Sequence, residues 1–226
     1  MDAKKMLSKF LIGSLILISF ASYSQENYLR VDKIEGATMM SPFIQNPDQK
    51  IEGDAYLHNE WKEIKIERVD GKKLLAPKAK YHIEQEELIV EVEDVLYRIN
   101  NKTQIRHFQI DDQTFRALFY EQDNFGFFQE LVVTSKIILL KKHICNVIKG
   151  QDTNGIMAAT SDKYSQHKTE YYVQKVVENS EPLLLKVSSK KISIKSDQYP
   201  ELSEFLDGIK GKFKSDASLV QVFQDF

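Results

Sequence analysis

A base and a nucleophile stand two residues apart at His143 and Cys145. On a β-strand this spacing puts both side chains on one face, where an imidazole could activate a thiolate. Side chains that are adjacent on one strand rarely reach the geometry of nucleophilic attack, so we expect no catalytic pair. Cys145 lies in the mostly apolar run Ile144–Ile148, and we predict a buried small side chain. Because it is the only cysteine, an intramolecular disulfide and multi-cysteine metal sites are excluded.

Two acidic patterns have the composition of ligand or acid–base sites. The segment Asp152–Gly155 looks like the start of a calcium loop, but it lacks the later carboxylates that a twelve-residue loop requires. Turn formation by Asn-Gly explains it better. A second group contains pairs of carboxylates that could perform glycoside chemistry. In a chain with 33 acidic residues a solvated face is the expected role of this group, Glu84, Glu86, Glu87, Glu91, Glu93 and Asp94.

The sequence contains none of the compact motifs that hold phosphates, dinucleotides, zinc or an activated serine. The five histidines are far apart, and no spacing between them predicts a shared metal ion. We therefore expect no catalytic, cofactor-binding or metal-binding residues, and no cofactor. The histidines, each expected to be a packed or surface residue, are His58, His82, His107, His143 and His167.

Charge gives little reason to expect nucleic acid as the partner. The 31 Lys and Arg residues nearly balance the 33 Asp and Glu residues, for a net charge of -2. Residues 186–214 hold seven lysines against four acids, which weak contact with an anionic surface and ordinary solvation explain equally well. With 28% charged and 42% hydrophobic residues, the composition is that of a globular protein.

The first 24 residues have the pattern of a secretory signal peptide. Three lysines precede the apolar run Phe10–Phe20, and Ser22 and Ser24 supply the small residues of a cleavage site before Gln25. The alternative is an N-terminal membrane anchor, but a span needs about 20 apolar residues and this run has 11. We expect an exported chain, periplasmic or extracellular, without a transmembrane segment.

The mature chain is dominated by the signals of β-strands. We expect an irregular lead-in at 25–50 and an antiparallel β body at 51–195, interrupted by a long polar loop at 149–168. The dipeptide Asp70-Gly71 predicts a hairpin with a type I′ turn. Short connections favour an antiparallel meander or open barrel-like sheet. The expected strands are Tyr28–Ile34, Glu63–Val69, Lys72–Leu75, Lys80–Ile83, Leu88–Val92, Leu96–Ile99, Ile105–Ile110, Thr114–Tyr120, Gly126–Val133, Lys136–His143, Glu170–Val177 and Leu183–Val187.

The pattern changes to helical spacing at 196–226. One apolar stripe begins after Pro200, and a second follows Asp216, which we expect to cap the second helix. Such short helices are marginal alone, so we expect at least one to dock on the sheet. The stripes are Leu202, Phe205, Leu206 and Ile209, then Leu219, Val222, Phe223 and Phe226.

The layout resembles an uncharacterised group of secreted proteins common in Bacteroidota. The matching features are the signal peptide, the Gly53-x-x-Tyr56-Leu57-x-x-x-Trp61 entry, the Leu139–Lys142 and Glu170–Val173 strands and the paired terminal helices. The resemblance implies an exported location and a β-rich fold, and it brings no catalytic residues.

Three functions are compatible with these features. The first is a non-catalytic binding or cell-envelope interaction protein. The second is a hydrolase acting on an envelope or dietary polymer, and the third is a carrier of an apolar ligand. An enzyme should show convergent polar groups in a concave site, whereas an interaction protein should expose an apolar patch. The sequence leaves the partner, an envelope component or apolar ligand, and the oligomeric state open.

Overall fold

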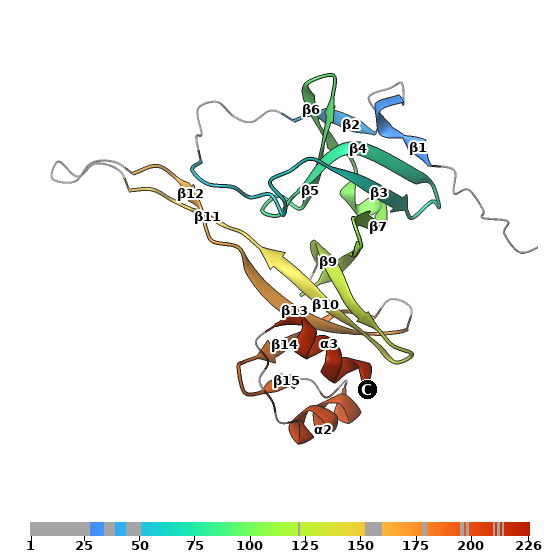
Figure 1. The fold of residues 1–226 in the computed structure, drawn as a ribbon, viewed down its shortest axis with the longest axis vertical. Helices are drawn as coiled ribbons and strands as arrows, with labels where there is room; N and C mark the ends of the chain where they lie inside the picture. The colour runs from blue at the N-terminus through green and yellow to red at the C-terminus, as the bar shows by residue number, and fades with distance from the viewer. Residues whose placement is uncertain are drawn as a thin grey trace, which may run out of the picture.

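The computed structural model describes residues 28–33, 39–43, 51–121, 123–151, 160–177, 180–194, 197, 199–209, 211, 213 and 215–226. The signal peptide expected at 1–24, most of the expected lead-in and the turn expected at Asp152–Gly155 lie outside these residues. The protein is mainly β, with one large antiparallel sheet and two short C-terminal helices, as the sequence predicts (Figure 1). The sheet is not closed into a barrel.

Fifteen strands are described, most of them long enough to show alternation of inward and outward side chains. They are β1 (Leu29–Arg30), β2 (Met40–Pro42), β3 (Lys62–Arg68), β4 (Lys73–His82), β5 (Glu87–Val92), β6 (Val95–Ile99), β7 (Ile105–Ile110), β8 (Gln113–Tyr120), β9 (Asn124–Val133), β10 (Ile137–Ile144), β11 (Val147–Ile148), β12 (Lys163–Tyr164), β13 (Lys168–Lys175), β14 (Leu183–Val187) and β15 (Ile192–Ile194).

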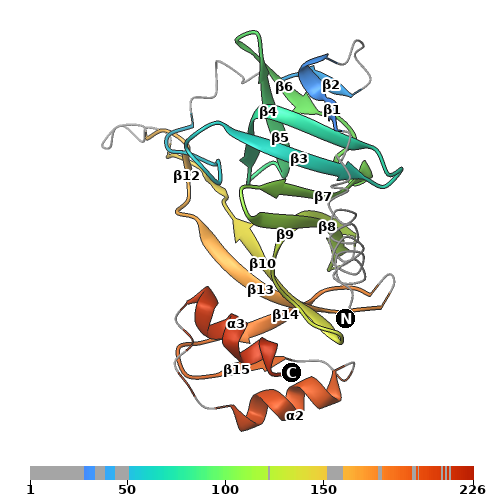
Figure 2. The same ribbon diagram turned by 45° about the vertical axis from the view of Figure 1, so that its right-hand side comes forward.

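The large sheet has the order β15-β14-β13-β10-β9-β8-β7-β3-β4-β5-β6-β2, and β1 pairs with β4 in parallel. Consecutive hairpins from β3 to β6 and from β7 to β10 form two meanders. The two meanders form one sheet because β7, the first strand of the second meander, pairs with β3, the first strand of the first. The long strands β9, β10 and β13 connect an N-terminal lobe with a C-terminal lobe that carries the helices (Figures 1 and 2).

Strand β4 corrects the expectation of two separate strands at Lys72–Leu75 and Lys80–Ile83. It is a single strand of ten residues that contains Pro77. The pairing with β3 shifts register between Lys62 and Ile64, opposite this part of β4. Proline cannot donate to the ladder, and a bulge is where a sheet tolerates it.

The hairpin at Asp70-Gly71 is present, but the expected turn type is wrong. Gly71 has φ +80, whereas Asp70 is not among the residues with positive φ, so a type I′ turn is excluded. Gly71 N–H donates to Arg68 O at 3.0 Å, and Arg68 N–H donates to Lys72 O at 2.9 Å. This is a type I turn followed by a glycine bulge, the three-residue solution for a twisted hairpin.

The polar loop expected at 149–168 is partly structured. The short strands β11 and β12 pair with each other and form a separate two-stranded ribbon. Glu52 N–H donates to Asp162 O at 2.9 Å and Tyr164 N–H donates to Glu52 O at 2.8 Å. These bonds attach the base of the ribbon to the segment before β3.

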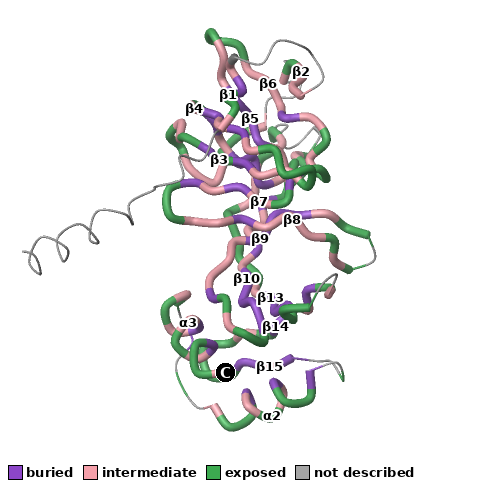
Figure 3. The backbone as a smooth tube through the Cα atoms, turned by 90° about the vertical axis from the view of Figure 1, so that its right-hand side faces the viewer, coloured by how far each residue is buried: buried purple, intermediate pink, exposed green. Residues whose placement is uncertain are grey.

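Two separate cores stabilise the two lobes, and buried segments run along the strands of both (Figure 3). The N-terminal core is rich in aromatic rings, with Phe108 and Phe115 stacked at 4.8 Å between centroids. The C-terminal core contains the helices α2 (Pro200–Gly208) and α3 (Asp216–Gln224), which pack on the sheet through Leu202, Leu206 and other buried apolar residues. Among the helices described, none is long and apolar enough to cross a membrane.

The cap of α3 differs from the expectation. Ser215, not Asp216, is the N-cap, and its hydroxyl accepts from Ser218 N–H at 3.3 Å in a capping box. Asp216 instead accepts from Lys141 Nζ and from the Tyr171 hydroxyl, both at 2.7 Å. These contacts fasten the start of α3 to β10 and β13.

Candidate functional site

The middle of the sheet is apolar on both faces. In β10 the four consecutive residues Ile137–Leu140 are all buried. Ile137 and Leu139 pack with the helices, whereas Ile138 and Leu140 belong to a separate cluster with Phe128 and Tyr172 on the opposite face. Strands with two apolar faces normally have both faces covered. The helices cover only one of them.

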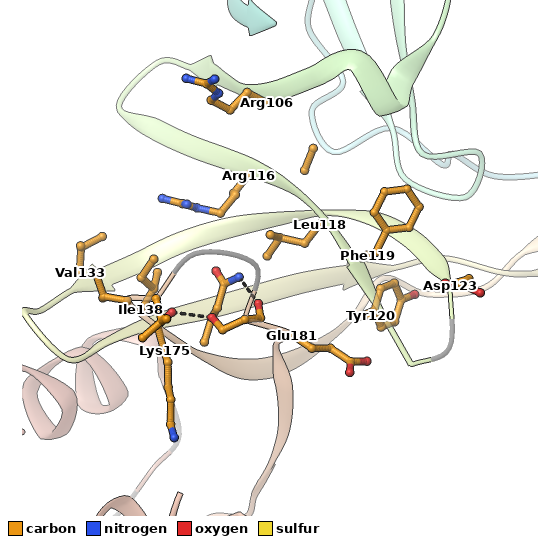
Figure 4. A pocket seen from close by; sticks show the side chains of 15 residues that line it. Arg106, Arg116, Leu118, Phe119, Tyr120, Asp123, Val133, Ile138, Lys175 and Glu181 are labelled. Carbon is orange, nitrogen blue, oxygen red and sulfur yellow. Dashed lines mark hydrogen bonds between the residues drawn. The ribbon is translucent and has the colours of Figure 1, made fainter. Parts of the chain in front are cut away.

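We call the other side of β8, β9, β10 and β13 the open face. It contains a groove of about 950 Å³ (Figure 4). Its lining includes Leu118 and Tyr120 of β8 and Ile138 of β10. In the sheet, β8 and β10 lie on either side of β9, and β13 follows β10.

Large apolar side chains at the groove are strongly exposed. Val177 is 66% exposed, Val133 59% and Phe119 55%, and Val176 is also exposed. Exposed apolar side chains that line one groove are a common mark of a binding surface. The groove therefore has the composition of a site for an apolar group.

The charged residues at the groove are arranged by sign. Arg106 and Arg116 lie toward one end, and Asp123 and Glu181 lie toward the other (Figure 4). Each guanidinium already has a carboxylate partner outside the groove lining. Arg116 Nη2 is 2.6 Å from a Glu130 oxygen, and Arg106 Nη1 is 3.3 Å from a carboxylate oxygen of Glu67 in β3.

One polar side chain of the groove is almost completely buried. Gln174 on β13 is 6% exposed and lies opposite Ile138 in the β10–β13 register. Its Nε2 donates to Ser180 O at 2.6 Å, and Ser180 Oγ donates to Lys175 O at 2.6 Å. Its Oε1 has no hydrogen-bond partner within the described part of the chain.

Beside the open face lies a buried ion pair that corrects the solvated-face interpretation of the acidic cluster. Glu86, at φ 51, forms an ion pair with Lys142 Nζ, accepts from the Tyr81 hydroxyl and accepts from Phe127 N–H at 3.0 Å. Lys142 is 5% exposed, and its Nζ lies 5.1 Å from the Tyr120 ring centroid. Burial and the Glu86 charge raise the pKa of Tyr81 well above its ordinary value.

Two other members of the cluster, Glu87 and Glu91, have side chains that are 17% and 16% exposed, close to the 14% of Glu86. Glu87 pairs with Arg98 at 3.2 Å and Glu91 with Lys78 at 2.7 Å. Glu93 and Asp94 are exposed and make the turn between β5 and β6 at positive φ. The sequence could not separate Glu86 from these neighbours, because its burial depends on β9 and β10.

His143 and Cys145 have different hydrogen-bond partners. Cys145 is buried, as predicted, and its Sγ lies 3.6 Å from Ser165 O. Burial raises the pKa of the thiol, which opposes thiolate formation. His143 Nε2 is 3.0 Å from Gln129 Oε1, and burial together with Lys141 lowers its pKa to about 4.

Among the remaining histidines, His58 has a buried Nε2 without a hydrogen-bond partner in the described part of the chain, and burial lowers its pKa. His82 is buried against Tyr56 and Tyr164, and burial lowers its pKa to about 4. His107 lies 3.6 Å from Glu67, and His167 Nε2 is 3.1 Å from Asp54 O. Within the described ranges, no group of three or more His, Cys, Asp or Glu residues is placed to hold a metal ion.

Comparisons of the chain with protein-family models, curated proteins and solved structures found no match. The groove on the open face is therefore the feature of this protein that bears most directly on its function. Sequence reasoning missed it, although one signal was present. The runs Phe125–Phe128 and Ile137–Leu140 are apolar at successive positions, which indicates strands buried on both faces.

Proposed function

We propose that this protein is an exported, non-catalytic binding protein that holds the apolar part of a ligand in the groove of the open face. The observation that carries the proposal is the exposure of Phe119, Val133, Val176 and Val177 around an apolar floor. Covering apolar surface contributes about 25 cal/mol for each Å² removed from water. A ligand with an alkyl chain gains this energy without the sheet having to rearrange.

The chemistry of the groove supports binding more than hydrolysis. The described lining residues include neither histidine nor cysteine, the usual proton carrier and thiol nucleophile. Arg106 and Arg116 are paired with carboxylates, so they are not prepared to stabilise a developing oxyanion. The interior of the N-terminal lobe is packed with aromatic rings, so a ligand belongs on the open face.

An exported location fits the same proposal. The pattern of a signal peptide at 1–24 and the resemblance to secreted proteins of Bacteroidota both support it. Envelope molecules in that location are rich in alkyl chains, the chemistry that the groove favours. The ligand is thus proposed to be an apolar component of the envelope or its surroundings.

A calorimetric titration tests the proposal. The chain from residue 25, which contains every described contact, is titrated with N-alkylacetamides of six to ten chain carbons. Affinity should rise with each methylene group by up to about fourfold, the equivalent of about 0.8 kcal/mol per buried CH₂.

A matched pair of surface variants locates the binding. Val177→Asp places a charge at the groove and should weaken binding at least tenfold. Val95→Asp alters a valine of β6 that is 47% exposed and lies outside the groove lining, so it should have no effect. Affinity that is independent of chain length, or equal losses in both variants, would refute the proposed function.

A further inference from the structure

From the unpaired acceptor in the groove we infer that the ligand is an amphiphile whose head group carries an N–H or O–H donor and no negative charge, and that Gln174 Oε1 accepts from it. This inference rests on the proposed function, because it names the chemistry of the ligand for the same groove. Gln174 is a specificity-determining residue in this account, since it discriminates between head groups on otherwise equal alkyl chains.

The orientation of the Gln174 amide follows from its neighbours. Its nitrogen must face Ser180 O, because a backbone carbonyl accepts and the two atoms are 2.6 Å apart. The opposite orientation would place two acceptors against each other. The Oε1 atom is therefore fixed as the unpaired atom, on a side chain that lines the groove.

A buried acceptor without a partner is unfavourable, and proteins rarely keep one. Oε1 is closed to solvent, so bulk water does not satisfy it. A ligand whose head group donates a hydrogen bond to Oε1 removes this unfavourable state. A ligand of the same shape without a donor leaves the acceptor unpaired.

The head group carries no negative charge, because the cations of the groove lining already have partners. Arg116 and Arg106 are held by Glu130 and Glu67. The third cation of the lining, Lys175, has its Nζ 4.7 Å from the Tyr199 ring centroid, and in Figure 4 it points away from the groove. An anionic head would have to break these existing contacts.

Paired probes that differ only in the donor test the inference. N-octylacetamide has an amide N–H, and N-methyl-N-octylacetamide has the same chain with no donor. In calorimetry the first should bind about tenfold more tightly, the typical value of one hydrogen bond to a buried acceptor. Octan-1-ol and its methyl ether repeat the comparison with an O–H donor and distinguish an alcohol from an amide source.

Gln174→Met tests the assignment to this side chain, because methionine has a similar length and no comparable acceptor. In this variant the two amides should bind within twofold of each other, whereas Gln109→Met on β7, outside the groove lining, should retain the tenfold ratio. If Gln174→Met does not fold, the ratio of the two amide affinities measured with the wild-type protein still tests the inference.

The outcomes separate this inference from the proposed function. Equal binding of both amides to the wild-type groove would overturn the role of Gln174 and leave the groove as an alkyl site. A tenfold ratio that persists in Gln174→Met would also overturn it. Absence of binding by every probe would overturn the proposed function and this inference together.

Discussion

Replacing Lys142 with methionine tests the contact that joins the turn before β5 to strands β9 and β10. Methionine fills most of the volume of the lysine stem but leaves the Glu86 carboxylate without its cation. Glu86 would keep only the Tyr81 hydroxyl and Phe127 N–H as partners. Removing one member of a buried ion pair costs about 3–5 kcal/mol, because the other charge remains buried.

The magnitude should lie near the lower limit, about 3 kcal/mol, because the Glu86 side chain retains 14% exposure. Urea unfolding followed by circular dichroism at pH 7 gives the free energy of unfolding. Lys78→Met is the matched control, since Lys78 pairs with Glu91 while 60% of its side chain is exposed. That variant should lose less than about 1 kcal/mol.

A double variant completes the cycle. Glu86→Gln removes the charge of the second partner and keeps its hydrogen-bonding shape. With Lys142→Met already present, this second change should restore stability, giving a coupling energy of about 2 kcal/mol. A loss below about 1 kcal/mol in Lys142→Met, or additive losses in the double variant, would refute the buried pair.

Four further predictions concern other parts of the chain. Burial lowers the pKa of His143 in the folded protein to about 4, below the 6.5 of an unperturbed histidine. Between pH 6.5 and 4 the unfolded chain therefore binds a proton that the folded protein does not. The free energy of unfolding should fall by up to about 3 kcal/mol as the pH decreases through this range. A pH series of urea melts should show a smaller slope in His143→Gln; equal slopes contradict the assignment. Gly71→Val should lower the free energy of unfolding by about 1–3 kcal/mol, because valine is strained at the φ of +80 that Gly71 adopts. The space around residue 71 is not the cause, since no atom lies within 4 Å of the new Cβ. An unchanged melting temperature would count against the bulged turn. Cys145 should react slowly with a bulky thiol reagent in the native protein, and rapid labelling would contradict its burial. Intact-mass measurement of protein recovered from the native envelope should give a chain starting at Gln25, and a species that retains Met1–Phe20 would contradict cleavage.

The sequence predicted where the strands and helices lie better than it predicted how the strands pair and which turns join them. Alternation and turn residues located most of the long strands, and helical spacing located α2 and α3, because these signals are local. It missed β2, whose partner β6 is distant in sequence, and it also missed the three-residue strand β15, although β15 pairs locally with β14. The Asp-Gly pair indicated a hairpin but not its turn type, since both solutions use glycine at positive φ.

The candidate site was not predictable to the same degree. The exposure of Val133 and Val177 and the unpaired Oε1 of Gln174 arise only when β10 and β13 pair and no described element covers the open face. Likewise, the sequence does not distinguish Glu86 from the neighbouring acids. Its contacts with Phe127 of β9 and Lys142 of β10 exist only in the folded sheet. Local pattern carries no information about which face a distant helix leaves uncovered.

Backbone-amide NMR shows where on the sheet a ligand binds. The isotope-labelled chain from residue 25 is titrated with N-octylacetamide, and shifts are mapped on the sheet. The account predicts saturable shifts concentrated at Leu118, Ile138, Gln174 and Val177, with little change in α2 and α3. Saturable shifts centred on the helices or the N-terminal lobe, or no shifts at all, would contradict it.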